Sequence, residues 1–195
     1  MQKISLIIIA AFLTITSGYA QTQKGNILLG SDISQLNLDF QSTNTAFAIN
    51  IDPKAGIFFK DNRLLGAQIT FGLSTQNKTT TIQYGLSAFG RYYFGTASTG
   101  LDRKTKWFIE INAGIVGSNI SGSNVEHSST NGLGAGIGPG LSYFISRTVA
   151  LEALAKYNLT TGFGNSIVDN AINANLGFQI FLSGIRLNTV PVPKQ

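Results

Sequence analysis

The sequence of 195 residues has no cysteine, one histidine, and little charge, because only 12% of its residues are Asp, Glu, Lys or Arg. Without cysteine, no disulfide can hold the chain and no lipid can be attached through a thiol. The single His127 leaves too few soft ligands for a metal site of the usual His and Cys type. Soluble domains carry about 25% charged residues. A surface with so little charge would associate in water, which indicates that much of it never meets water.

A long apolar run is also missing beyond the first residues. Lys3, the apolar run at 4–15 and the small residues around Ala20 form the pattern of a signal peptide, which predicts a signal at 1–20 and cleavage before Gln21. No later stretch approaches the roughly 18 apolar residues of a transmembrane helix. The chain is therefore predicted to be exported, with one domain at 21–184 and an extended C-terminal tail at 185–195 that contains Pro191 and Pro193.

Apolar and polar residues alternate with a period of two from Gln21 onward, which is typical of β-strands. In 47–59, for example, the odd positions are apolar, and the even positions are polar, charged or small. The phase slips once, near Ser34-Gln35, which indicates a β-bulge, and Pro139 predicts a second bulge or a strand end. The pattern predicts about eight strands of roughly ten residues, the length of a tilted membrane strand, at 25–40, 47–59, 65–74, 82–91, 107–115, 133–143, 149–158 and 172–182.

The predicted links alternate in length. Those at 60–63 and 145–148 are short, whereas those at 74–80, 117–131 and 160–170 are longer and rich in Ser, Thr, Asn and Gly. Tight inner turns and longer outer loops are typical of up-and-down membrane barrels. The stretch 95–106 is an exception, since its position predicts an inner turn but it is long.

Alternation alone fits two kinds of barrel, because a soluble lipocalin-like barrel places its apolar residues inside and a membrane barrel places them against lipid. The polar face carries charges of both signs in equal number, which would pair inside a narrow lumen. We expect these charges to form a network that plugs the lumen: Asp52, Lys54, Arg91, Glu110, Glu152 and Lys156.

The aromatic residues cluster beside the predicted inner links, where membrane barrels carry a girdle at the lipid–water interface. The predicted girdle consists of Phe58, Phe59, Tyr92, Tyr93, Phe94, Trp107, Phe108, Tyr143 and Phe144. Together with the charges, it favours an all-β fold: a closed antiparallel up-and-down transmembrane β-barrel.

Segments such as GNILLG at 25–30, AGIFF at 55–59, FGRYYF at 89–94 and GLGAGIGPGLSYF at 132–144 give the chain a family likeness. Through them it resembles the porin-like outer-membrane β-barrel domain family of Gram-negative bacteria. The resemblance implies an eight-stranded barrel in the cell outer membrane and implies no particular activity. The chain departs from the family at its end, because such barrels often finish on an aromatic residue of the last strand, and here residues 185–195 follow.

The functional expectation is a structural or interaction protein, not an enzyme, with outer-membrane lipid around it and a ligand or partner met by its outer loops. No cofactor, metal or nucleic acid is expected. The alternatives are a narrow porin-like channel past Arg91 and Glu110, and a soluble exported barrel that binds a small ligand. A lipid hydrolase built on His127 and its neighbours Glu126, Ser128 and Ser129 is disfavoured, because a catalytic triad is made by geometry and seldom by sequence neighbours.

Overall fold

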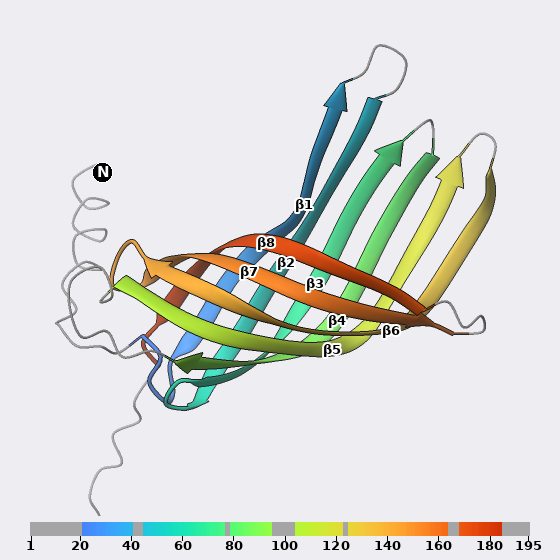
Figure 1. Ribbon diagram of the computed structural model, residues 1–195. Coiled ribbons are helices and arrows are strands. Elements are labelled where there is room, and N and C mark those ends of the chain that lie inside the picture. Colours follow the sequence, from blue (N-terminus) through green and yellow to red (C-terminus); the bar gives the residue numbers. More distant parts are fainter. Residues whose placement is uncertain are drawn as a thin grey trace, which may run out of the picture.

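The computed structural model describes residues 21–40, 45–76, 79–94, 104–122, 125–163 and 168–184, so the predicted signal peptide and C-terminal tail lie outside the described residues. Each strand pairs antiparallel with the next, and the last pairs with the first, which closes the barrel as predicted (Figure 1). The strands are β1 (Ile27–Phe40), β2 (Thr45–Lys60), β3 (Arg63–Gln76), β4 (Thr79–Phe94), β5 (Thr105–Gly122), β6 (Val125–Phe144), β7 (Val149–Gly162) and β8 (Val168–Leu182).

The strands have 14 to 20 residues, and all of them except β1 are longer than predicted. Most of the predicted outer links at 74–80, 117–131 and 160–170 belong to strands instead. The Ser and Asn residues there favour loops, but β-branched Thr favours strands. Thr75 and Thr80, for example, face each other across β3 and β4 with hydroxyls 3.4 Å apart. In Figure 1 the hairpins β1–β2, β3–β4 and β5–β6 project far beyond the barrel body.

The opposite end of the barrel carries the tight turns and both ends of the described chain, and we call it the terminal end. β2 and β3 are joined there through Asp61 and Asn62, and Asn62 adopts a left-handed conformation with φ 61°, which Asn tolerates well. In the turn between β6 and β7, the Ser146 hydroxyl accepts hydrogen bonds from the backbone N–H groups of Thr148 and Val149. The other end is called the distal end.

The irregularities of the ladder agree with the sequence in one place and differ in another. The predicted bulge of β1 is confirmed, since its register against β2 shifts between Ile33 and Gln35. The bulge or strand end predicted at Pro139 is wrong, because Pro139 pairs with Ile109 in a continuous stretch of the β5–β6 ladder, whose register shifts only farther along, between Ile120 and Gly122. On its other side, β6 pairs with β7 up to Ile137 and again from Gly140 in the same register. The missing N–H of proline therefore interrupts one ladder locally and requires no extra residue.

Apolar side chains cover the outer wall of the barrel. Along β5 this outer row runs through residues 107–115 and includes Trp107, Ile111 and Ile115, all more than half exposed. That length is close to the about 9–11 residues that a tilted strand needs to cross a bilayer. Towards the distal end, polar residues continue the outward rows of their strands: Thr75, Asn119, Asn131 and Thr161. The soluble barrel with an apolar interior is contradicted, because Arg91, Glu110 and Glu152 are buried inside the barrel while rows of large apolar side chains are exposed on its outer wall.

Candidate functional site in the barrel lumen

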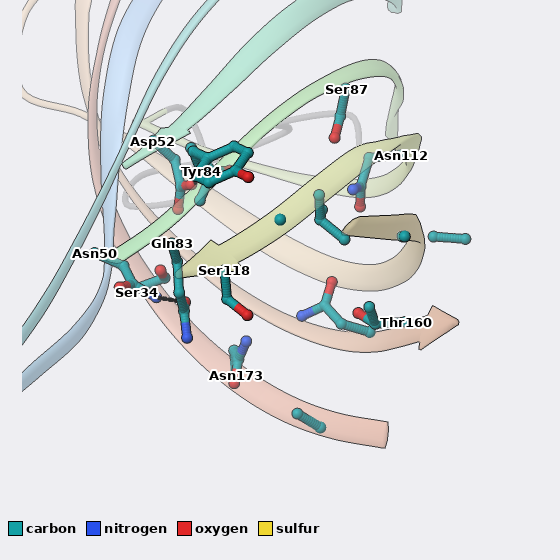
Figure 2. Close-up of a pocket in the computed structure, with 18 of the residues that line it drawn as sticks. Ser34, Asn50, Asp52, Gln83, Tyr84, Ser87, Asn112, Ser118, Thr160 and Asn173 are labelled. Carbon is teal, nitrogen blue, oxygen red and sulfur yellow. Dashed lines mark hydrogen bonds between the residues drawn. The ribbon is translucent and has the colours of Figure 1, made fainter. Parts of the chain in front are cut away.

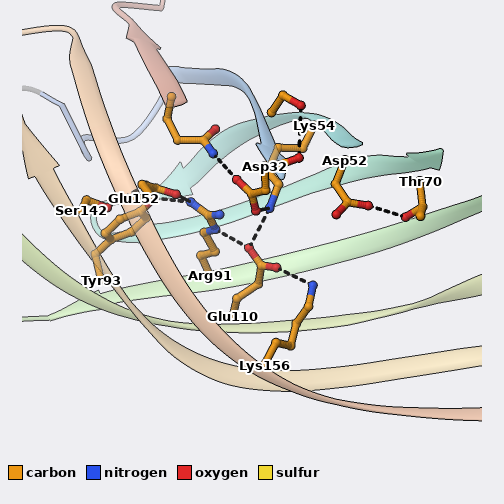
Figure 3. Close-up of polar contacts among 12 residues, drawn as sticks. Asp32, Asp52, Lys54, Thr70, Arg91, Tyr93, Glu110, Ser142, Glu152 and Lys156 are labelled. Carbon is orange, nitrogen blue, oxygen red and sulfur yellow. Dashed lines mark hydrogen bonds and ion pairs between the residues drawn. The ribbon is translucent and has the colours of Figure 1, made fainter. Parts of the chain in front are cut away.

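The centre of the lumen holds a network of ion pairs, which we call the ion-pair layer (Figure 3). Glu110 of β5 is at its middle: its carboxylate lies 2.6 Å from Arg91 Nε, 3.2 Å from Lys156 Nζ and 3.4 Å from Lys54 Nζ. Two further pairs complete it, Lys54 with Asp32 at 2.6 Å and Arg91 with Glu152 at 2.7 Å. The layer thus contains three carboxylates and three cations, the balance that buried charge requires.

Three of these five ion pairs connect strands that are not neighbours in the sheet. Arg91 on β4 reaches Glu152 on β7, and Glu110 on β5 reaches Lys54 on β2. Hydrogen bonds add side chains from two further strands. Ser142 of β6 donates to Glu152 at 2.6 Å, and Gln179 of β8 donates to Asp32 at 2.7 Å. The layer therefore ties opposite walls of the barrel together and fills its cross-section with buried side chains.

Glycines on the same inner face leave room for these long side chains. A Cβ at Gly177 would collide with the Asp32 carboxylate, and a Cβ at Gly30 would collide with the Gln179 amide. Both glycines lie directly beside these residues in the ladder, since Asp32 pairs with Gly177 and Gly30 pairs with Gln179. A larger residue at either position would push a member of the layer away from its partner.

Five of the six residues of the predicted charge network lie together in the ion-pair layer, and the sixth does not. Lys54, Arg91, Glu110, Glu152 and Lys156 all belong to the ion-pair layer. Asp52 does not join any described ion pair; it accepts a hydrogen bond of 2.7 Å from Thr70 instead. Its place is taken by Asp32, which sequence reasoning missed. The signal was present, because Asp32 shares the inner face with Leu28 before the β1 bulge changes the phase.

The predicted aromatic girdle divides between the two faces of the wall. Phe59, Tyr92, Phe94, Trp107 and Tyr143 are exposed on the outside, and their role as an interfacial girdle stays a prediction. For Phe58, Tyr93, Phe108 and Phe144 the girdle prediction is wrong, since these four side chains are buried inside the barrel. The reason is the period of two itself: adjacent aromatics such as Phe58-Phe59 must point to opposite faces.

The inward aromatics form a second layer between the ion pairs and the terminal end, which we call the aromatic layer. Phe181 joins it, with ring centroids 5.1 Å from Phe144 and 6.2 Å from Phe58, and Tyr93 lies 5.4 Å from Phe108. The two layers are in contact, because the Arg91 guanidinium lies 4.4 Å from the Phe108 ring centroid and donates to the Tyr93 hydroxyl. Cation–π contacts of this kind are strongest when water is excluded.

The first described residues cover the terminal end of the barrel. Thr22 is buried; its hydroxyl donates to Asn62 and accepts a hydrogen bond of 2.7 Å from Lys106 Nζ. Its backbone carbonyl accepts from the Asn62 N–H, and Gly25 N–H donates to the Phe58 carbonyl. The segment that follows the predicted cleavage site is thus fastened to β2, β5 and the β2–β3 turn.

The distal half of the lumen holds a cavity of about 450 Å³, shown in Figure 2. Its floor is the ion-pair layer, reached at Lys156, and its walls carry Asn, Gln, Ser and Thr side chains from all eight strands. Burial increases with depth, from exposed Gln83 through half-buried Asn112 to buried Gln68 and Asn175. From the terminal end to the distal end, the lumen therefore contains a covering segment, an aromatic layer, an ion-pair layer and a polar cavity.

Comparison with known proteins identifies this arrangement as a known fold. No protein-family model matches the sequence, and no curated protein matches it significantly. Among solved structures the chain is similar to Neisserial surface protein A, with a TM-score of 0.54 and 18% identity over 82% of this chain and 97% of that one. It is also similar to Ail, the attachment invasion locus protein of Yersinia pestis, with a TM-score of 0.51 and 14% identity over 82% and 100% of the two chains.

The chain has the fold of a small outer-membrane β-barrel. At these identities the likeness concerns the fold and not the activity. The fold that the sequence resemblance implies is thereby confirmed. A closed barrel satisfies every backbone hydrogen bond without water, and the apolar outer wall of this barrel suits lipid. The protein thus has the fold and the apolar outer wall of a transmembrane barrel.

Within the described ranges, no group of three or more His, Cys, Asp or Glu side chains could hold a metal ion, and no helix is long and apolar enough to cross a membrane. His127 was expected in an outer loop, but its backbone belongs to strand β6.

Proposed function

We propose that this protein is an outer-membrane barrel with a closed lumen and a structural or interaction role, which presents its distal hairpins and its distal cavity to the outside of the cell. The proposal assigns it no catalytic activity and no cofactor. The tight turns at the terminal end support this orientation, since membrane barrels carry their tight turns on the periplasmic side. The signal peptide predicted at 1–20 and the tail predicted at 185–195 are part of the same proposal.

The observation that carries the proposal is the stacking of two dense layers across one narrow lumen. Glu110 and Arg91 are fully buried at the centre of the ion-pair layer, and Phe58 and Phe108 are fully buried in the aromatic layer beneath it. A hydrated ion would have to separate opposite charges that hold each other at 2.6–3.4 Å and then pass the packed rings. Breaking buried ion pairs is strongly unfavourable, which supports a lumen that does not conduct.

Planar bilayer recording tests this directly. We expect the purified full-length protein to insert and to show no steady conductance steps. Insertion is verified separately by flotation with vesicles and by a heat-dependent shift in gel migration. Steady, ion-selective steps from protein that passes both checks would contradict the closed lumen.

A narrow channel is the second candidate, and the distal cavity favours it, since its polar walls extend from the distal end to Lys156 in the middle of the barrel. A channel predicts that Glu110→Ala, which removes the central carboxylate, changes conductance and ion selectivity. The matched control is Asp61→Ala, which removes a carboxylate from the β2–β3 turn outside the lumen. The absence of conductance steps from the wild type and from both variants would exclude the channel.

A further inference from the structure

The polar cavity in the distal half of the lumen has the chemistry of a ligand site. Its size of about 450 Å³ falls within the range of small-molecule pockets. Among its described lining residues only Asp52 and Lys156 are charged, and each already has a partner, Thr70 for Asp52 and Glu110 for Lys156. The free hydrogen-bonding capacity of the walls is therefore neutral, which disfavours an ionic ligand.

Three side-chain amide oxygens in the lower part of the cavity, which we call its floor together with the ion-pair layer, lack hydrogen-bond partners in the described part of the barrel. The side-chain oxygens of Gln68, Asn112 and Asn175 accept no hydrogen bond from the described residues, and Gln68 and Asn175 are only 6% and 4% exposed. Buried polar atoms in native proteins nearly always have a partner. These three amides come from β3, β5 and β8, so they converge on the cavity from different sides of the barrel.

A hydroxyl group is the partner that fits such amides best. It both donates and accepts hydrogen bonds, so it satisfies an amide whichever end faces the cavity. The walls above the floor repeat the same chemistry, with Asn50, Gln83 and Asn173 beside Ser and Thr hydroxyls (Figure 2). Asn158 also lines the cavity. A sugar matches many neutral donors and acceptors and has no net charge.

We propose that the distal cavity binds a neutral, hydroxyl-rich ligand of the size of a mono- or disaccharide, which enters from the distal end. Gln68, Asn112 and Asn175 bind its hydroxyls at the floor, and the ion-pair layer stops it from passing further. This inference deepens the proposed function and rests on it, because a closed lumen makes the cavity a binding site and not the entrance of a channel.

The test uses the full-length protein in phospholipid nanodiscs, since alkyl glycoside detergents would compete for the cavity. Isothermal titration calorimetry is run with glucose, lactose, maltose and sucrose. Glucuronic acid, glucosamine and an uncharged blocked dipeptide serve as comparison ligands. We expect saturable binding of at least one neutral saccharide. Gln68→Leu and Asn175→Leu should each weaken that binding tenfold or more, because leucine offers no hydrogen bond.

The matched control is Asn119→Leu, which makes the same change on the outer wall of β5. It should leave saccharide binding unchanged. Ser118→Trp narrows the cavity near its exposed rim without touching the floor, and it should also reduce binding. Each variant must show the heat-dependent gel shift of a folded barrel before it is titrated.

Three results would overturn the inference: no neutral saccharide binds at high millimolar concentration, only the charged sugars or the dipeptide bind, or the floor variants bind as the wild type does. Bilayer recordings on the same preparations separate the two proposals. A silent barrel that binds no saccharide refutes the ligand and leaves the closed lumen standing. A conducting barrel that binds saccharide refutes the closed lumen alone.

Discussion

At the scale of single residues, Glu110 has the largest electrostatic role in the barrel. It is the only carboxylate of the described ion pairs that contacts three cations. Glu110→Gln would leave Lys54, Arg91 and Lys156 buried with two carboxylates between them. We expect the free energy of unfolding to fall by about 3–5 kcal/mol, the usual cost of an uncompensated buried charge. Urea titration in detergent micelles, followed by gel migration, measures it.

Two further variants make that result specific. Asp52→Asn removes a lumen charge outside the ion-pair layer and keeps an oxygen for the Thr70 hydroxyl. The free energy of unfolding of this variant should therefore fall by less than about 1 kcal/mol. Adding Lys156→Gln to Glu110→Gln restores the balance of charge and should recover part of the loss. Equal destabilisation by Asp52→Asn and Glu110→Gln would show that pairing within the layer does not matter.

The residue scale also shows where sequence reasoning succeeds and fails. The inward charges were predictable because a period of two assigns each residue of a regular strand to one face. The same rule, applied to neighbours, would have separated Phe58 from Phe59 and Phe108 from Trp107, which the girdle prediction joined. Asp32 could have been assigned to the inner face by the same rule, because it precedes the bulge of β1. Its contact with Lys54 depends on the register between β1 and β2, which the sequence of one strand does not give.

At the scale of elements, close approach of β6 and β7 depends on glycine. A Cβ at Gly138 would collide with the backbone carbonyl of Ala155, and backbone cannot move aside as a flexible side chain can. Gly138→Ala should therefore lower the free energy of unfolding by about 1–3 kcal/mol through overpacking. Gly90→Ala is the control, since its Cβ would meet only atoms at 3.7 Å, and it should be neutral or slightly stabilising. Equal effects of the two variants in urea titrations would contradict a requirement for glycine in β6.

Element lengths were the least predictable feature. Alternation located all eight strands, yet their distal parts were assigned to loops because Ser, Thr and Asn there break the apolar rows. In water a strand needs only backbone pairing and tolerates polar side chains on both faces. The apolar rows therefore mark the part of each strand within lipid, such as residues 107–115 of β5, and not the whole strand, which ends at Gly122.

At the scale of the whole molecule, the depth of the barrel in the bilayer follows from its outer wall. Ile111 lies in the middle of the apolar row of β5, and Asn119 lies on the same face of the same strand beyond that row. An arginine at the bilayer midplane of a barrel costs about 2–4 kcal/mol, and one near the interface costs about 0–1 kcal/mol. Ile111→Arg should thus be strongly destabilising in lipid, and Asn119→Arg nearly neutral.

Guanidinium titration of both variants in phospholipid vesicles measures this difference. Trp107 is the sole tryptophan of the chain and is exposed on the outer wall, so its fluorescence reports transfer from lipid to water as the barrel unfolds. A soluble barrel would have water on this wall and would tolerate arginine equally at both positions. Loss of stability at Ile111 alone requires a nonpolar solvent around the middle of β5, and no packing inside the barrel can mimic it because this side chain points away from the lumen.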